Sequence, residues 1–293
     1  MKNFVDLSVP VVLGSDASSV SMAMQPSALQ AGILLFSPIS SAVDLRGKPM
    51  FLRTCPADDA QAVDMARWLF ENGIKRAGIL YVANTWGDGL ASAFRNAYPK
   101  LGGQIVAEES VESDKVVEYR TQLLNLRKAG AEAIFSPTYP NGAGLVVKQA
   151  REMKWDVPLY GADCWQDPQL VSIAGKYAEG ASFICPGFDE IGPKGAAFVQ
   201  KYRAKYGQDP NFNAASSYDA MNILAEAVEK VLAANETLTG TNIRIALLGL
   251  THSGVTGETR YGQDSEPVGK LFNRMRIEQG KATRIPVTAT LTK

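Results

Sequence analysis

The sequence predicts an α/β protein with two lobes, each a parallel sheet flanked by helices. Short apolar runs of about four to six residues alternate along the chain with stretches of helical periodicity, which is the pattern of strand–helix–strand units. The length of 293 residues exceeds that of most single domains and favours two lobes. A hydrophobic content of 46% with 20% charged residues is typical of a globular chain.

The apolar runs define the predicted strands. The first run, 9–13, is rich in β-branched residues, and 77–82 is apolar throughout, as expected of a strand that is buried on both faces. The predicted strands are, in chain order, 9–13, 33–36, 51–54, 77–82, 104–108, 133–136, 159–160, 182–185 and 270–276, the last followed by a turn at 279–280.

Helical periodicity fills most of the segments between these strands. Asp58 and Asp59 open one helix, at the end where the helix dipole favours acids, and Gly73 ends it. Gly102 and Gly103 close the next helix in the same way. The predicted helices are one that reaches 31 after the first strand, then 58–72, 90–101, 118–129, 145–153, 168–174, 195–206 and 217–234.

Charge and hydropathy exclude two classes of partner. Thirty basic and thirty acidic side chains leave a formal net charge of zero, so no broad field attracts nucleic acid or an anionic membrane. No stretch approaches the roughly 18 consecutive apolar residues of a membrane span. We therefore expect no nucleic-acid partner and no direct insertion into a membrane.

The loops that follow the predicted strands carry compatible groups. They read GSDASS after 9–13, SPISSA after 33–36, NTWGDG after 77–82, PTYP after 133–136 and GADCW after 159–160. In an open parallel sheet, ligands bind beyond the carboxyl ends of the strands, where such loops meet. The candidate ligand-binding residues are Ser18, Ser19, Ile39, Ser40, Ser41, Trp86, Tyr139 and Asp163.

These groups together suit a small zwitterion. Hydroxyls and backbone N–H groups at a helix N-terminus bind a carboxylate, because the amides there lack partners and the dipole is positive. The acid Asp163 would bind an ammonium group through a charge-assisted hydrogen bond. The aromatic side chains of Trp86 and Tyr139 would cover an aliphatic part. The sequence therefore predicts a receptor for an α-amino acid with an apolar side chain.

Each candidate also has a purely structural interpretation. Ser18 and Ser19 are good helix N-caps, and serines such as Ser40 are common in turns. Aromatic residues more often pack in a core than line a ligand site, and Asp163 is also suited to cap a helix. Tyr218, at the start of a predicted helix, is expected to be a core tyrosine, with a place beside the ligand as the lesser alternative. These alternatives stay open for every residue taken singly.

Six segments, taken in order, resemble the amino-acid-binding proteins that serve ABC importers, of the Leu/Ile/Val-binding type with the type I periplasmic-binding-protein fold. They are LFSPISSAVDL, FLRTCPADDAQA, ILYVANTWGDGLASAF, VVKQAREMKWDVPLYGAD, KYAEGASFICPGF and AASSYDAMNILAEAV. The resemblance implies two α/β lobes joined by three crossovers, a ligand bound between them by hinge closure, and no cofactor. It also implies a periplasmic location and a membrane permease of an ABC transporter as partner.

The resemblance assigns lobes and site residues. The first lobe would comprise 1–57 and 187–264, and the second 58–186 and 265–293. In the first lobe, Ser18 with its neighbour Ser19 and the loop 37–41 would hold the ligand carboxylate, with Ser41 where the family has a threonine. In the second lobe, Trp86 stands where a tyrosine is usual, Tyr139 matches the other aromatic, and Asp163 replaces the ammonium-binding glutamate. These replacements leave the ligand side chain undetermined.

The resemblance also predicts an incomplete first lobe. Family members carry a strand, a helix and a further strand before the segment that matches 9–13, and an export signal before those; neither is present in this sequence. A first lobe without its first strand is expected to leave apolar sheet edges exposed. A truncated gene product, an upstream start or a neighbouring chain would each account for this departure.

The alternatives to an amino-acid importer component are an enzyme, a sensor for amides and a binder of aromatic or small carboxylates. The only histidine, His252, is expected in a loop without a nucleophile pattern, and an acid pair of Asp163 with Asp167 is the remaining catalytic option. Asp163 disfavours a ligand that lacks an ammonium group, because two carboxylates would repel each other. We expect no enzyme, no metal site, and three free, mostly buried thiols at Cys55, Cys164 and Cys185.

Overall fold

The chain is distributed over two structural units, each of which combines two separate segments. The structure is a computed structural model that describes residues 1–113, 115–188, 190, 192–262, 264–270 and 272–285. Unit 1 comprises Met1–Ala57 and Pro186–Leu271, and unit 2 comprises Asp58–Cys185 and Phe272–Lys293. The last return of the chain to unit 2 therefore follows residue 271, against a predicted boundary after 264. Of the predicted segment 265–293, residues 271 and 286–293 lie outside the described residues.

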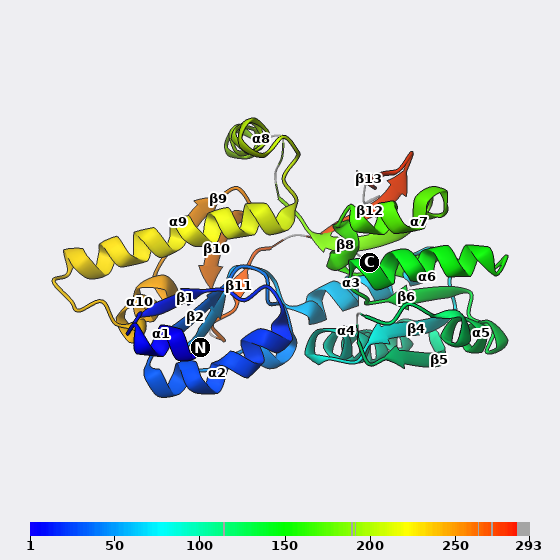
Figure 1. Cartoon of the computed structure of the whole chain (residues 1–293), viewed down its shortest axis with the longest axis horizontal. Helices are drawn as coiled ribbons and strands as arrows, with labels where there is room; N and C mark the ends of the chain where they lie inside the picture. The colour runs from blue at the N-terminus through cyan, green and yellow to red at the C-terminus, as the bar shows by residue number, and fades with distance from the viewer. Residues whose placement is uncertain (114, 189, 191, 263, 271, 286–293) are drawn as a thin grey trace. The chain divides into compact units, whose positions relative to one another are not determined.

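Unit 1 is built on a three-stranded parallel sheet (Figure 1). Its order is β1 (Val11–Leu13), β2 (Leu34–Ser37) and β3 (Phe51–Arg53). Leu35 packs with the α2 residue Ala28 in one cluster, whereas Leu34 and Phe36 pack in another with residues of α9 and α10. Both faces of β2 are therefore covered, which is why its residues 34–36 are apolar. The helices of this unit are α1 (Lys2–Asp6), α2 (Ser18–Ala31), η1 (Val43–Leu45), α8 (Pro193–Tyr206), α9 (Phe212–Ala233) and α10 (Gly240–Leu248).

A second, antiparallel sheet in unit 1 follows α10. It consists of β9 (His252–Gly254), β10 (Gly257–Tyr261) and β11 (Pro267–Val268). The expectation of a loop around His252 was wrong, and α1 and α10 were not predicted. The hairpin strands are short and rich in polar residues, so they lack the apolar alternation that marks a strand in the sequence.

Unit 2 is built on a seven-stranded sheet with the order β13-β12-β8-β7-β6-β4-β5. The pairings from β5 across β4, β6 and β7 to β8 are parallel, whereas β12 and β13 form an antiparallel hairpin. The strands are β4 (Arg76–Val82), β5 (Gln104–Val111), β6 (Ala133–Ser136), β7 (Leu159–Gly161), β8 (Ser182–Pro186), β12 (Phe272–Glu278) and β13 (Lys281–Arg284). The predicted α/β class with parallel sheets and flanking helices is confirmed.

Two helices of unit 2 begin earlier than the sequence predicts. The helices are α3 (Asp58–Glu71), α4 (Thr85–Ala97), η2 (Pro99–Leu101), α5 (Arg120–Lys128), α6 (Pro140–Glu152), η3 (Asp163–Gln166), α7 (Gln169–Ala174) and η4 (Gly175–Ala178). The segments TWGDG and PNGAG look like loops because of their glycines, but they form the first turns of α4 and α6. Asn84 caps α4 by accepting the N–H groups of Trp86 (3.1 Å) and Gly87 (3.0 Å), and Pro140 takes the first position of α6.

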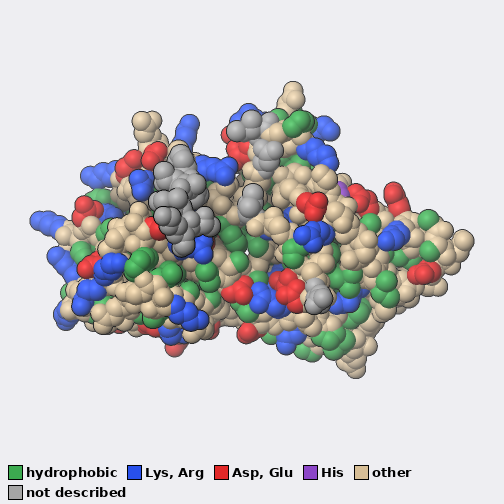
Figure 2. Space-filling model, turned by 180° about the vertical axis from the view of Figure 1, so that it is seen from behind, with side chains coloured by type: hydrophobic (Ala, Val, Ile, Leu, Met, Phe, Trp, Pro, Cys, Tyr) green, Lys and Arg blue, Asp and Glu red, His purple; other side chains and the backbone are tan. Residues whose placement is uncertain are grey.

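The surface carries charges of both signs. On the face drawn in Figure 2, basic and acidic side chains are interspersed, in keeping with the equal numbers of the two in the sequence. Within the described ranges, the helices are too short or too polar for any to span a bilayer.

Two glycines of α4 are expected to respond oppositely to alanine. A Cβ at Gly87 would lie 2.0 Å from the carbonyl oxygen of Val82, whereas a Cβ at Gly89 meets no atom within 4 Å. Gly89→Ala should therefore raise the free energy of unfolding by about 0.5–1 kcal/mol, because glycine is costly inside a helix. Gly87→Ala should lower it by roughly 1–3 kcal/mol, because α4 must move away from β4. Urea unfolding of both variants measures this, and equal effects would contradict the close approach of α4 to β4.

Candidate ligand-binding site

A network of serine hydroxyls joins two loops of unit 1, the one that follows β1 and the one that follows β2. Ser37 Oγ donates to the carbonyl oxygen of Ser15 (2.6 Å) and accepts the N–H of Ser40 (2.8 Å). Ser40 Oγ donates to the same Ser15 oxygen (2.8 Å) and lies 2.8 Å from Ser21 Oγ. The hydroxyl of Ser40, one of the candidate ligand-binding residues, is thus fully buried and engaged in holding the loops.

The N-terminus of α2 and the loop after β2 place several donors side by side. Ser18 is the first residue of α2, and its Oγ accepts the N–H of Ala42 (3.1 Å), which holds the two segments together. The first N–H groups of a helix, here those of Ser18 and Ser19, have no intrahelical acceptor. Among the described residues, neither the N–H nor the hydroxyl of Ser41 has a hydrogen-bond partner. These groups form a donor cluster suited to an anion such as a carboxylate.

Ile39 lies in the same loop of unit 1 as Ser41. Its N–H donates to Ser37 Oγ (3.2 Å), and its side chain is half-buried. The serine network therefore fixes the backbone at Ile39 and Ser40, directly before the donors of Ser41. The structure brings together the five candidates of unit 1 that the sequence names.

In unit 2, Asp163 is a buried acid at the start of η3, directly after β7. The residue is 8% exposed, and its Oδ1 has no hydrogen-bond partner among the described residues. Burial raises the pKa of Asp163 to about 6, against the opposing effects of the Gln61 side chain and of the backbone N–H groups of Cys164 and Asp163. A buried carboxylate oxygen without a partner is costly, so a cationic donor placed there would gain both charge pairing and a hydrogen bond.

The two aromatic candidates of unit 2 contact each other. The rings of Trp86 and Tyr139 stack at a centroid distance of 4.9 Å and an interplanar angle of 17°. Trp86 is only 3% exposed and packs within the core of unit 2, whereas Tyr139, the residue before α6, is half-buried. Asn84 Nδ2 also donates to the Tyr139 hydroxyl (3.3 Å). The structure therefore shows Trp86 as a packing residue that supports Tyr139, and a contact of Trp86 with the ligand stays a prediction.

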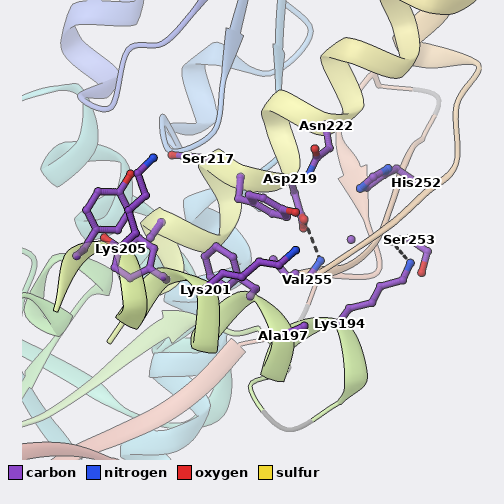
Figure 3. A pocket seen from close by; sticks show the side chains of 16 residues that line it. Lys194, Ala197, Lys201, Lys205, Ser217, Asp219, Asn222, His252, Ser253 and Val255 are labelled. Carbon is purple, nitrogen blue, oxygen red and sulfur yellow. Dashed lines mark hydrogen bonds between the residues drawn. The ribbon is translucent and has the colours of Figure 1, made fainter. Parts of the chain in front are cut away.

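A cavity of ≈ 720 Å³ lies elsewhere in unit 1, between α8, α9 and the β9–β10 hairpin (Figure 3). None of the eight candidate residues lines it. Tyr218 does, and at 46% exposure with its ring 5.0 Å from that of Phe198 it is not the core tyrosine expected from the sequence. His252 lies here too, with Nδ1 2.7 Å from Glu226 Oε1. Asp219 is engaged with the hairpin, since its carboxylate accepts the N–H groups of Val255 and Thr256 (both 2.8 Å).

Residues considered for catalysis or metal binding have structural roles. Asp167 Oδ1 accepts the N–H of Gln169 (2.8 Å) at the start of α7. The thiols of Cys55 and Cys185 are buried, that of Cys164 is half-buried, and none of the three belongs to a disulfide. Within the part of the chain that the structure describes, no group of three or more His, Cys, Asp or Glu side chains could hold a metal ion.

Comparison with known families agrees with this architecture. A sequence model described as "Periplasmic binding protein" matches residues 1–282 of the chain. The chain belongs to this family. The resemblance predicted from the six segments is thereby confirmed, and the family is one of solute-binding proteins rather than enzymes.

Three similar proteins show how this periplasmic binding protein relates to others. It is 25% identical over 204 residues to the leucine-, isoleucine-, valine-, threonine- and alanine-binding protein of Pseudomonas aeruginosa, a match that covers 68% of this chain and 54% of that relative. The chain thus spans about half the length of that relative. The leucine-binding protein LivK of Thermotoga maritima is 23% identical with a TM-score of 0.89, over 97% of this chain and 81% of LivK. LivJ of Streptococcus pneumoniae, solved with isoleucine, is 28% identical with a TM-score of 0.84, over 97% and 82%.

Sequence reasoning missed two residues of this periplasmic binding protein that interact with candidate residues, one in each unit. Gln61 of α3 donates from Nε2 to the carbonyl oxygen of Ile184 (2.8 Å) and contributes to the polar surroundings of Asp163. Arg53, at the end of β3, is fully buried and donates to the carbonyl oxygens of Ser40 (3.2 Å) and Ala42 (2.9 Å). An arginine that ends an apolar strand was a usable signal, because a buried guanidinium must find acceptors.

The burial of Asp163 predicts a pH-dependent cost to stability. Asp163 holds its proton up to about pH 6 in the folded chain, whereas an unfolded aspartic acid loses it near pH 4. The folded state therefore binds more protons in this interval, so this group lowers the free energy of unfolding as pH rises from about 4 to about 6. Asp163→Asn removes the charge, and at pH 7 the ligand-free variant should be more stable than the parent by on the order of 2–3 kcal/mol.

Urea unfolding of parent and variant at pH 4, 5, 6 and 7 measures this difference, which should vanish near pH 4. Asp44→Asn, at an exposed acid, serves as the control and should show no such trend. A stability difference for Asp163→Asn that does not change with pH would mean that the acid is not desolvated.

Proposed function

We propose that this periplasmic binding protein is the extracytoplasmic substrate-binding component of an ABC importer and binds a small neutral α-amino acid. Branched-chain amino acids are the first candidates, because the similar proteins include one named for leucine, isoleucine, valine, threonine and alanine binding and one solved with isoleucine. The periplasm is the proposed location, and the membrane permease of the transporter is the proposed partner.

The observation that carries the proposal is the buried, unpartnered Oδ1 of Asp163. An ammonium group satisfies such an oxygen with a charge-assisted hydrogen bond and removes the cost of its desolvation. A carboxylate ligand without an amino group would bring a second negative charge to the same place. Asp163 thus favours an amino acid over the aromatic or small carboxylates, and over amides that lack an ammonium group.

The donor cluster of unit 1 favours a negatively charged group, whereas Asp163 favours a positively charged one. The N–H and hydroxyl of Ser41, with the N–H groups of Ser18 and Ser19 at the start of α2, suit a carboxylate. In this proposal unit 1 binds the carboxylate of the ligand, and unit 2 binds its ammonium group through Asp163. Tyr139 would cover the side chain, supported by Trp86. A ligand held by groups of both units would stabilise a closed state by hinge motion.

Thermal unfolding with single amino acids tests the proposal. Each common L-amino acid is added at millimolar concentration, and a ligand present at 100 times its dissociation constant should stabilise the folded chain by about 2.7 kcal/mol. We expect a clear rise in Tm for a few neutral amino acids. A cooperative transition that no amino acid shifts, but that an amide or an aromatic acid does, would transfer the function to one of those ligand classes.

Replacement of Asp163 tests the ammonium assignment. The parent should bind L-leucine at least tenfold more tightly than 4-methylpentanoate, which lacks only the amino group, because the charge pair contributes more than one kcal/mol when desolvated. Asp163→Asn should remove most of this preference, and titration calorimetry measures both ligands. Asp167→Asn is the matched control, since this neighbouring acid caps a helix and should leave the preference intact. An unchanged preference in Asp163→Asn would show that the ammonium group binds elsewhere.

A further inference from the structure

We propose that Arg53 is a positioning residue for the carboxylate end of the ligand site, because its guanidinium sets the direction of the Ser41 N–H. This inference rests on the proposed function of the donor cluster in unit 1. Arg53 contacts no predicted ligand atom itself and acts through the backbone of the loop after β2.

The guanidinium of Arg53 holds this loop from within the unit. Its side chain is fully buried, and Nη1 donates both to the carbonyl oxygen of Ser40 (3.2 Å) and to that of Ala42 (2.9 Å). The first carbonyl belongs to the peptide unit that joins Ser40 to Ser41, and the second to the peptide unit that follows Ala42. One guanidinium therefore fixes the backbone on both sides of Ser41. Arginine can bind both carbonyls through Nη1 while Nε and Nη2 bind Glu266 in the same plane, whereas the single ammonium of a lysine cannot reproduce this fixed geometry.

Peptide planarity converts this contact into a direction for the donor of Ser41. The carbonyl of Ser40 and the N–H of Ser41 belong to the same trans peptide unit and point in opposite directions. Because the Ser40 oxygen is bound by the buried Arg53, the Ser41 N–H must point away from Arg53. That N–H has no acceptor among the described residues. It is therefore available to donate to an oxygen atom of a ligand.

Glu266 fixes the other side of the guanidinium. Its Oε2 accepts from Arg53 Nη2 (2.6 Å) and Nε (3.0 Å), and the residue is buried in the segment that leads to β11. The hydroxyl of Tyr261 donates to the carbonyl oxygen of Arg53 (3.1 Å). A buried ion pair adds little net stability compared with apolar packing, so a role in holding geometry accounts better for this arrangement.

The test compares Arg53→Lys with Arg274→Lys in the full chain. Arg274 is a matched control in unit 2, a buried arginine that pairs with Asp64 (2.8 Å) and Glu71 (2.6 Å). The first measurement is hydrogen exchange of the ligand-free segment 38–45, and the second is the Kd for L-leucine by calorimetry. Arg53→Lys should speed exchange in 38–45 at least fivefold and raise the Kd at least tenfold. Arg274→Lys should lower Tm but leave both quantities within twofold of the parent.

Glu266→Gln is a second variant that retains Arg53 and covers the case in which Arg53→Lys does not fold. It keeps an acceptor for the guanidinium, so exchange in 38–45 and the Kd should change in the same direction but by smaller factors. The inference is overturned if the folded Arg53 or Glu266 variants leave both quantities within twofold of the parent. A parent chain that binds no leucine would instead exclude leucine as the ligand, and the exchange measurement would still decide the role of Arg53.

Discussion

The loops at the carboxyl ends of the parallel strands depend on side-chain hydrogen bonds. Their backbone groups no longer pair with a neighbouring strand, although they are still buried in the protein. A buried backbone group without a partner costs free energy comparable to a lost hydrogen bond, so each loop needs internal donors and acceptors. In unit 1 the serines at 15, 21, 37 and 40 supply them from the loops, and Arg53 supplies them from the end of β3. The abundance of small hydroxyl residues where a strand passes into a helix follows from this requirement.

This requirement divides the polar residues of the site into two groups. Residues such as Ser37 and Ser40 satisfy the loops and are saturated by protein partners. Ser41 and Asp163 keep polar atoms that no described residue satisfies. Under the proposed function, a ligand of opposite polarity compensates the cost of such atoms. Gln122 and Arg274 also keep unpartnered buried atoms, so an unpartnered atom identifies a binding group only together with the proposed function.

The fold was largely predictable from the sequence. Which polar candidates have protein hydrogen-bond partners and which do not was not predictable. Runs such as 77–82 and 133–135 are apolar throughout and lie in largely buried strands, so their pattern identifies them directly. The starts of α4 and α6 were missed because glycines near a helix start look like a loop until the cap is known. The position of Ser40 in the SPISS loop made it a ligand candidate, yet its hydroxyl turned out to be saturated. Whether a serine hydroxyl has protein hydrogen-bond partners depends on residues far away in the sequence. A local sequence pattern does not identify those residues.

Asp163, the proposed ammonium-binding residue, illustrates why a binding group can destabilise the ligand-free protein. Its carboxylate is desolvated by the surrounding unit, which shifts its proton affinity toward the neutral form and weakens the folded state at neutral pH. The same desolvation strengthens any ion pair that forms there, because fewer waters compete for the charge. A fully solvated acid would cost nothing and discriminate little between an ammonium group and a neutral atom. Under the proposed function, the instability of the ligand-free protein and its selectivity for an ammonium group therefore have one cause, and a substitution that relieves the first should weaken the second.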